Sequence, residues 1–228
     1  SDDGALLLAL LDSLTTTTAA RFSVDDFARR MLAWLHEGQY TPDGKVFDVG
    51  VQTSAALGRI AKGMPAAQAG ARGVLDNGNG ALMRVLPAAF MTATDDQAVA
   101  IARLQGLPTH GHLTSQLCCA LYVLVARRLL DGMAFDLAYA SVCPHLPPFL
   151  APGEGAALSV LLAERKPGRG SGYVADSLWS AFDCVAATGS YEEAVRAAIA
   201  LGHDTDTTAC IPGGLGGAVP LGRLVAGR

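Results

Sequence analysis

The chain has 228 residues, of which 50% are hydrophobic, so it can bury a sizeable core as one domain spanning residues 1–228. Its formal net charge is −4 and its charged residues, 17% of the total, are scattered, which gives no electrostatic reason to expect nucleic acid as a steady partner. No apolar run approaches the roughly 18 residues that span a bilayer, so we expect no membrane partner and a cytoplasmic location, unless a signal peptide preceded Ser1 and was removed.

The predicted elements are almost all helices. Ser23 and Asp26 have the spacing of a capping box, and so do Ser190 and Glu193, so each pair marks a helix start. Apolar side chains recur at helical spacing in two longer stretches, and each stretch is therefore expected to bury one face. The positions are 113, 117, 121 and 124 in the first stretch and 174, 178, 182 and 185 in the second.

Loops rich in Gly and Pro separate these helices. They lie at residues 38–44, 75–80, 144–155 and 166–172. No alternation of apolar and polar residues persists long enough to indicate a strand. The sequence therefore predicts an all-α fold, a single compact bundle of helices.

Acidic residues gather near both ends of the chain. Residues 1–3 read Ser-Asp-Asp, and residues 204–208 read Asp-Thr-Asp-Thr-Thr at the expected start of a helix. Either cluster alone is more typical of a helix N-cap than of a metal site. Brought together, however, four carboxylates would repel by roughly 4 kcal/mol per close pair at an effective dielectric constant of about 20, unless a cation intervened. Carboxylate and hydroxyl oxygens suit Mg²⁺ or Mn²⁺ rather than zinc, so we expect one metal site if the fold joins the two ends.

A glycine-rich loop at residues 76–80 (DNGNG) is a candidate phosphate-binding segment. The two glycines around Asn79 let the backbone approach a ligand closely. A helix beginning near Ala81 would direct free N–H groups at a phosphate. An ordinary Asn-Gly turn is the alternative, and it is the better interpretation of this segment taken alone.

Four segments, in their order along the chain, carry a resemblance to a known family. They are residues 76–84 (DNGNGALMR), 109–112 (THGH), 170–174 (GSGYV) and 202–209 (GHDTDTTA). Together they resemble the ADP-ribosylglycohydrolase family over nearly the whole chain, with weaker similarity at residues 41–44, 47–50 and 190–195. The resemblance implies an orthogonally packed helical bundle with a metal-containing cleft. The chain departs from the usual pattern at Gly4, where the family has threonine, and at His203, where it has glycine.

The resemblance also implies a centre of two Mg²⁺ or Mn²⁺ ions. Its implied ligands are Ser1, Asp2, Asp3, Asp204, Asp206 and Thr207. The ions would bind the ribose hydroxyls, orient water at C1″ and stabilise developing charge, with Asp3 and Asp206 acting in catalysis. Asp76 is the candidate acid/base for the leaving group, and a solvated turn carboxylate is the alternative for it. Relatives also carry a helix upstream of the Ser1 position with another acidic residue, which we expect in the natural protein.

The implied substrate contacts are Asn79, Gly80, His110, Gly172 and Tyr173. His110 and His112 have a spacing that occurs in zinc sites, but no third nitrogen or sulfur ligand is evident. We therefore expect His110 beside the bound ADP-ribose and His112 in a capping or packing role. Tyr173 would stack on adenine, with a place in the core as the alternative.

The predicted function is metal-dependent removal of ADP-ribose from a modified protein side chain or a small molecule. The sequence leaves open whether the bond is N- or O-glycosidic, since arginine, serine, O-acetyl-ADP-ribose and nucleic-acid adducts all remain possible substrates. The alternative from another class is a non-catalytic ADP-ribose-binding or crystallin-like scaffold protein of the same fold. The acidic clusters favour the enzyme, because a scaffold has no use for clustered carboxylates.

Overall fold

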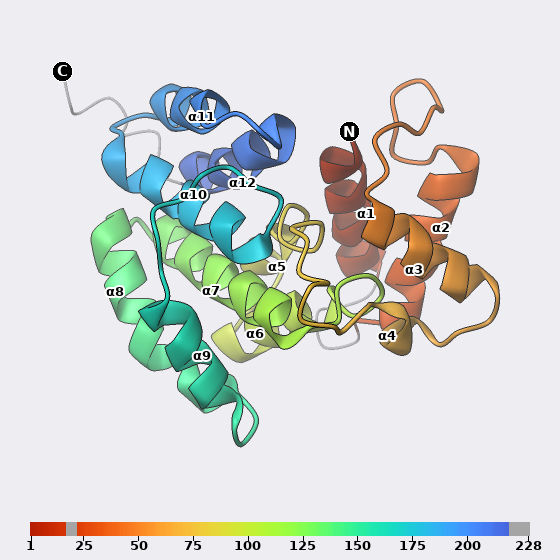
Figure 1. Ribbon diagram of the computed structural model, residues 1–228, viewed down its shortest axis with the longest axis horizontal. Helices are drawn as coiled ribbons and strands as arrows, with labels where there is room; N and C mark the ends of the chain where they lie inside the picture. The colour runs from red at the N-terminus through yellow and green to blue at the C-terminus, as the bar shows by residue number, and fades with distance from the viewer. Residues whose placement is uncertain (17–21, 219–228) are drawn as a thin grey trace.

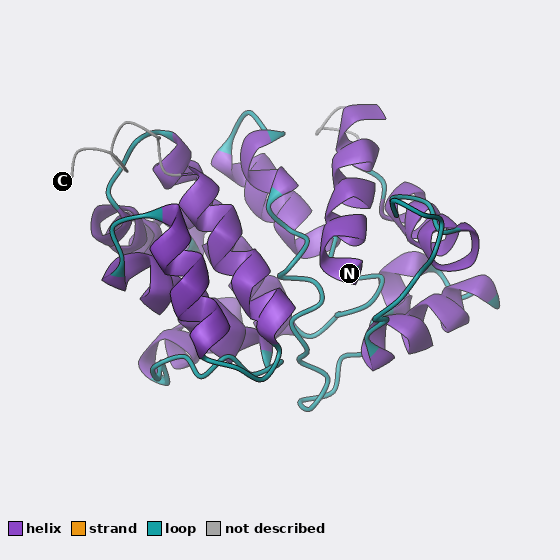
Figure 2. Cartoon of the chain, turned by 90° about the horizontal axis from the view of Figure 1, so that it is seen from above, coloured by secondary structure: helices purple, strands orange, loops and turns teal. Residues whose placement is uncertain are grey.

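The computed structural model describes residues 1–16 and 22–218, and every regular element in that part of the chain is a helix (Figures 1 and 2). The predicted all-α fold is confirmed. In chain order the helices are α1 (Asp2–Thr16), α2 (Val24–Glu37), α3 (Val51–Ala61), α4 (Ala66–Ala69), α5 (Pro87–Phe90), α6 (Asp95–Leu104), α7 (Leu113–Leu130), α8 (Phe135–His145), the 3-10 helix η2 (Pro147–Phe149), α9 (Glu154–Ala163), α10 (Val174–Ala187), α11 (Tyr191–Ala200) and α12 (Thr205–Ala218).

Both predicted helix starts are confirmed by their caps. The Ser23 hydroxyl accepts a hydrogen bond from the Asp26 N–H at 3.2 Å, and the Ser190 hydroxyl accepts one from the Glu193 N–H at 3.2 Å. These bonds satisfy N–H groups that have no partner within the helix. The loop expected at residues 144–155 is shorter than predicted, because α8 continues to His145 and η2 follows it. Pro144 stands in the last turn of α8, where its missing N–H costs only one terminal hydrogen bond.

Helix α7 is the centre of the bundle and packs against α5, α6, α8, α9, α10 and α12. Its 18 residues have a mean hydropathy of 1.4, so it is long and apolar enough to cross a membrane. The expectation that no apolar run approaches this length was therefore wrong. Since 67% of the helix is buried inside the protein, its apolar character is accounted for by its place in the core.

The helices form two groups that meet at a junction. Helices α1 to α4 pack on one another. Helices α6, α8, α9, α10 and α12 pack around α7, α11 packs on α10 and α12, and α5 packs on both α1 and α7 (Figure 1). The start of the chain lies at this junction, with α10 and α12 on its other side (Figures 1 and 2). The fold thus brings residue 1 towards the first turn of α12.

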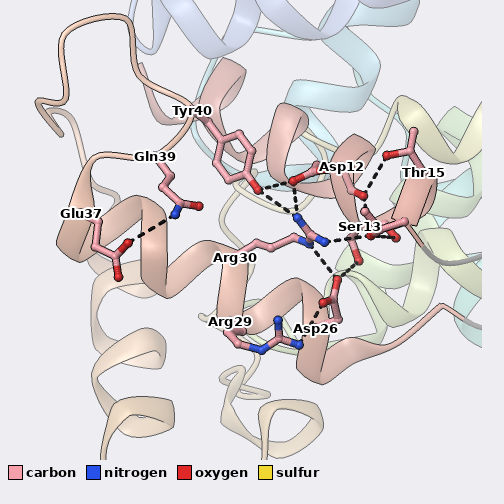
Figure 3. A network of polar contacts seen from close by, with 10 residues as sticks. Asp12, Ser13, Thr15, Asp26, Arg29, Arg30, Glu37, Gln39 and Tyr40 are labelled. Atoms are coloured by element: carbon pink, nitrogen blue, oxygen red, sulfur yellow. Dashed lines mark hydrogen bonds and ion pairs between the residues drawn. The ribbon is translucent and has the colours of Figure 1, made fainter.

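A polar network centred on Arg30 fastens α1 to α2 (Figure 3). The guanidinium donates to Asp26 Oδ2 at 2.8 Å, to the Thr16 hydroxyl at 2.8 Å, and to Asp12. The Tyr40 hydroxyl also donates to Asp12 at 2.7 Å, which adds the loop after α2 to the network. Burial acts to raise the pKa of Asp26, but hydrogen bonds from Arg30 and Ser13 outweigh it and hold that pKa below its usual value.

Replacing Arg30 with Met should therefore lower the free energy of unfolding by about 2–3 kcal/mol, because charge-assisted bonds to Asp26 and Asp12 are lost together. Arg29→Met is the matched control, since Arg29 pairs with the same Asp26 but its side chain is 71% exposed. We expect the control to lose less than about 1 kcal/mol. Urea unfolding of the two variants measures the difference, and equal losses would show that Arg30 does not anchor α1.

Candidate functional site

The two acidic ends of the chain meet in a cleft at the junction of the two helix groups. The cleft has a volume of about 280 Å³, and its walls include Asp2 at the start of α1 and both Asp204 and Thr207 at the start of α12. The negative charge of Asp206 acts to raise the pKa of the Asp3 carboxyl, and hydrogen bonding with the Thr207 side chain acts to lower it. The expected helix N-terminus at the second cluster is therefore present, and the fold gathers both clusters.

The electrostatics of the cleft reflect this gathering. Burial, followed by the charge of Asp3, raises the pKa of Asp2 to about 7. Burial also raises the pKa of Asp3; hydrogen bonding from Ser1 opposes that shift, and the charge of Asp206 adds to it. Burial together with the charges of Asp3, Asp206 and Asp2 raises the pKa of the neighbouring Cys210 thiol to about 12. Carboxylates from both ends of the chain are thus close enough to shift the pKa values of the same groups.

The carboxylate and hydroxyl oxygens of the two clusters are the kinds of ligand that a hard cation such as Mg²⁺ or Mn²⁺ prefers. Asp3 is 3% exposed; its Oδ2 accepts from the Ser1 hydroxyl at 2.8 Å, while its buried Oδ1 has no hydrogen-bond partner among the residues that the structure describes. Buried anionic oxygens without partners are costly, and a cation would satisfy this one. Within residues 1–16 and 22–218, however, no three His, Cys, Asp or Glu side chains are arranged as a metal site. A cation would thus need hydroxyl ligands or a small closing movement of the carboxylates.

The cleft also contains two residues that the sequence did not predict to be there, Asp48 and Gln52. Asp48 stands in the loop before α3 with a φ of 56°, lines the cleft, and adds to the raised pKa of Asp2. Gln52 joins three segments by donating to the Asp76 and Thr109 carbonyls at 3.0 and 3.2 Å and accepting from the Gly78 N–H at 3.3 Å. The only signal was the weak family similarity at residues 47–50, which includes Asp48 but not Gln52, because the place of both residues depends on how the α2–α3 loop folds back.

The Asn79 side chain ties the glycine-rich loop to the second acidic cluster. Its amide donates to Asp204 Oδ2 at 2.7 Å and to the Ser177 hydroxyl at 3.1 Å. The helix predicted near Ala81 is wrong: residues 81–84 form turns instead. The Ala81 carbonyl, which a helix would offer to the N–H four residues on, accepts from Gln105 Nε2 at 3.1 Å.

The Asp76 carboxylate has a local structural partner, since its Oδ2 accepts from the Gly73 N–H at 2.9 Å. Asp76 is not among the residues that line the cleft. Its backbone carbonyl is also engaged, by Gln52. To act as an acid or base at the cleft, Asp76 would have to leave its turn.

His110 lines the cleft and His112 does not. His112 caps α7, its Nδ1 accepting from the Thr114 N–H at 3.1 Å, as its expected capping role requires. The His110 ring is 2% exposed and lies so close to Gly80 that a Cβ there would stand 2.7 Å from its Cε1. Burial, and secondly the charge of Arg84, lower the pKa of His110 to about 3, so the ring is neutral at pH 7.

Gly172 and Tyr173 lie at the rim rather than inside the cleft. The Gly172 carbonyl accepts from the Asn79 N–H at 3.0 Å, which pairs the two loops. Tyr173 caps the start of α10, is 49% exposed, and lines a neighbouring groove of about 390 Å³ that also includes Lys166, Arg169 and Trp179. Its ring is accordingly available to a ligand and is not a core side chain.

Three comparisons with known proteins each give a match. The sequence model described as ADP-ribosylglycohydrolase matches residues 1–220. Two curated relatives are named ADP-ribosylarginine hydrolase Tri1: that of Serratia proteamaculans (strain 568) is 27% identical and that of Pseudomonas putida (strain GB-1) is 28% identical, each over 96% of this chain. The chain spans only 59% and 58% of their lengths. A solved structure described as an ADP-ribosylglycohydrolase-related protein complex superposes with a TM-score of 0.72 at 29% identity, covering 100% of this chain and 74% of that one.

Gly80→Ala should lower the free energy of unfolding by about 1–3 kcal/mol, because the added methyl group overlaps the buried His110 ring. Gly58→Ala is the matched control, since its added Cβ on the exposed side of α3 would meet nothing within 4 Å. Removing a glycine from a helix interior should raise stability there by roughly 0.5–1 kcal/mol. Urea unfolding reports both values, and an equally stable Gly80→Ala protein would contradict the close packing of His110 on this loop.

Proposed function

Because the chain belongs to the ADP-ribosylglycohydrolase family, we propose that it hydrolyses the bond between ADP-ribose and a modified protein side chain, with arginine as the acceptor. The observation that carries the proposal is the meeting of two acidic clusters, more than 200 residues apart in sequence, at one cleft. Two relatives named as ADP-ribosylarginine hydrolases support the choice of arginine. A small molecule that contains ADP-ribose is the alternative substrate.

The proposed centre holds two Mg²⁺ or Mn²⁺ ions, whose ligands would be the residues that the sequence singled out. These are Ser1, Asp2, Asp3, Asp204, Asp206 and Thr207, joined by Asp48 as a further carboxylate. Such ions supply a template for the ribose hydroxyls and stabilise developing charge. They would also explain why the fold tolerates carboxylates that raise one another's pKa. A bound cation attracts each carboxylate and so lowers these pKa values.

The protein groups around the centre have separate tasks. We assign to the Asp3 carboxylate, whose pKa is raised by burial and by the charge of Asp206, the role of accepting a proton from the water that attacks C1″. Asn79 fixes Asp204 through its amide and so holds the second cluster at the cleft wall. To protonate the departing group, the Asp76 side chain would have to release the Gly73 N–H and carry a proton itself.

The rest of ADP-ribose would extend from the cleft towards Tyr173. Gly78 and Gly80 line the cleft, and their missing side chains make room for Gln52 and His110; the diphosphate would lie along this loop. Beyond them, Tyr173 offers an exposed ring for stacking with adenine, and Lys166 and Arg169 in the adjoining groove add positive charge. The cleft, the glycine-rich loop and Tyr173 therefore follow one another in the same order as the ribose, the diphosphate and the adenine of the ligand.

The test of the function is release of ADP-ribose from ADP-ribosyl-arginine protein, measured with Mg²⁺, with Mn²⁺ and after chelation of divalent ions. We expect release only in the presence of a divalent ion. Binding of ADP-ribose with no release from any substrate under any of these conditions would instead support the non-catalytic binding protein of the same fold.

Asp206→Asn and Asp204→Asn should each reduce the release of ADP-ribose by at least about a hundredfold, because each removes one carboxylate from the centre. Calorimetric titration with Mn²⁺ should show weaker binding, and circular dichroism should show an unchanged helical content. Asp25→Asn, an exposed carboxylate in the first turn of α2, is the control and should retain activity. Full activity in either cluster variant would remove the two-metal site.

Tyr173→Ala should weaken ADP-ribose binding about fivefold or more while slowing catalysis less, because base–aromatic stacking contributes roughly 1–3 kcal/mol. Tyr191→Ala is the control: Tyr191 is 48% exposed, much like Tyr173, but lines a pocket formed by other residues. Calorimetry with ADP-ribose compares the two. An unchanged dissociation constant for Tyr173→Ala would place adenine elsewhere.

A further inference from the structure

Arg84 is a cation enclosed in the interior, and no carboxylate in the described part of the chain is hydrogen-bonded to it. Its side chain is fully buried, and its Nε and Nη2 donate to Gln105 Oε1 and to the Gln105 carbonyl, both at 2.9 Å. Its guanidinium carbon lies 5.3 Å from the centre of the Phe27 ring. A buried charge whose described hydrogen-bond partners are all neutral is expensive, even with the charge of Asp2 acting on it through space, so its position needs an explanation beyond packing.

The third partner of Arg84 leads to the cleft. Nη2 also donates to the Thr109 hydroxyl at 2.8 Å, and that hydroxyl lies 2.8 Å from His110 Nδ1. Arg84, Thr109 and His110 therefore form a continuous chain of hydrogen bonds from the interior to the wall of the cleft. Thr109 is 0% exposed, so water does not interrupt this chain at its middle.

The directions of these hydrogen bonds follow from the donors available. A guanidinium can only donate, so the Thr109 oxygen must be the acceptor of the bond from Arg84. The single hydroxyl proton of Thr109 then needs an acceptor, and His110 Nδ1 is the partner within reach. With Nδ1 accepting, the proton of the neutral ring must be on Nε2. The opposite tautomer would leave a buried hydroxyl proton without an acceptor, which is disfavoured.

We propose that Arg84, acting through Thr109, fixes His110 in the tautomer that carries its proton on Nε2 and so presents a hydrogen-bond donor to the cleft. The Nε2 edge faces the glycine loop, 3.3 Å from where a Cβ of Gly78 would lie, and the described residues give it no acceptor. The ligand group it fits is an oxygen that only accepts, such as a phosphate oxygen. Arg84 and Thr109 are positioning residues. The identity of the ligand rests on the proposed function, whereas the tautomer does not.

The tautomer is tested on the ligand-free protein by nitrogen NMR of the histidine ring, with His110 assigned by comparison with His110→Asn. We expect the proton on Nε2 and an unprotonated Nδ1 in the wild type and in Thr109→Ser, which keeps the hydroxyl. Thr109→Val, which is close in shape, should lose this preference and populate the Nδ1–H form. A wild-type ring with its proton on Nδ1, or a Thr109→Val ring identical to the wild type, would overturn the proposal.

Binding of ADP-ribose supplies the second measurement. Thr109→Val should weaken it by roughly two- to tenfold, the range of one hydrogen bond, while Thr109→Ser should stay within about twofold of the wild type. Equal affinities for all three proteins would show that the Nε2 donor is not used by this ligand. The NMR measurement needs no substrate. A protein with the Nε2 tautomer but no hydrolase activity would therefore refute the proposed function and still support the positioning of His110 by Arg84 and Thr109.

Discussion

The repulsion among carboxylates at the junction of the two helix groups is the constraint on which the rest of the structure depends. Asp2 and Asp3 are almost completely buried at the start of α1, and Asp206 at the start of α12 adds its charge to theirs. Two helix N-termini offset part of this negative charge, since each carries a partial positive charge. The remainder favours the protonated form of Asp2, and it is the reason why we propose a bound cation in the cleft.

The surrounding structure holds these groups in place against that repulsion. Arg30 fastens α1 to α2, so the start of α1 cannot withdraw from the junction without breaking a partly buried ionic network. On the opposite side, the Asn79 amide holds Asp204, and Gln52 links the α3 start to the loops that carry Asp76 and Thr109. Rigid support of this kind is what a preorganised site requires.

Features that depend on interactions between residues close in sequence could be predicted from the sequence, and features that depend on distant residues could not. The helix starts at Ser23 and Ser190 were predictable because a cap bonds to an N–H only three residues away. The helix expected near Ala81 failed because its carbonyl is taken by Gln105, 24 residues along the chain. His203 was recognised as a departure from a glycine position, and its φ of 58° shows the left-handed backbone that glycine adopts without strain.

The most direct measurement is anomalous diffraction from crystals grown with Mn²⁺, because it locates the ion without relying on activity. We expect manganese in the cleft, bound by carboxylate oxygens from both Asp3 and Asp206, so that one centre joins the two ends of the chain. Manganese bound by only one of these clusters, or a cleft without manganese under saturating conditions, would contradict it.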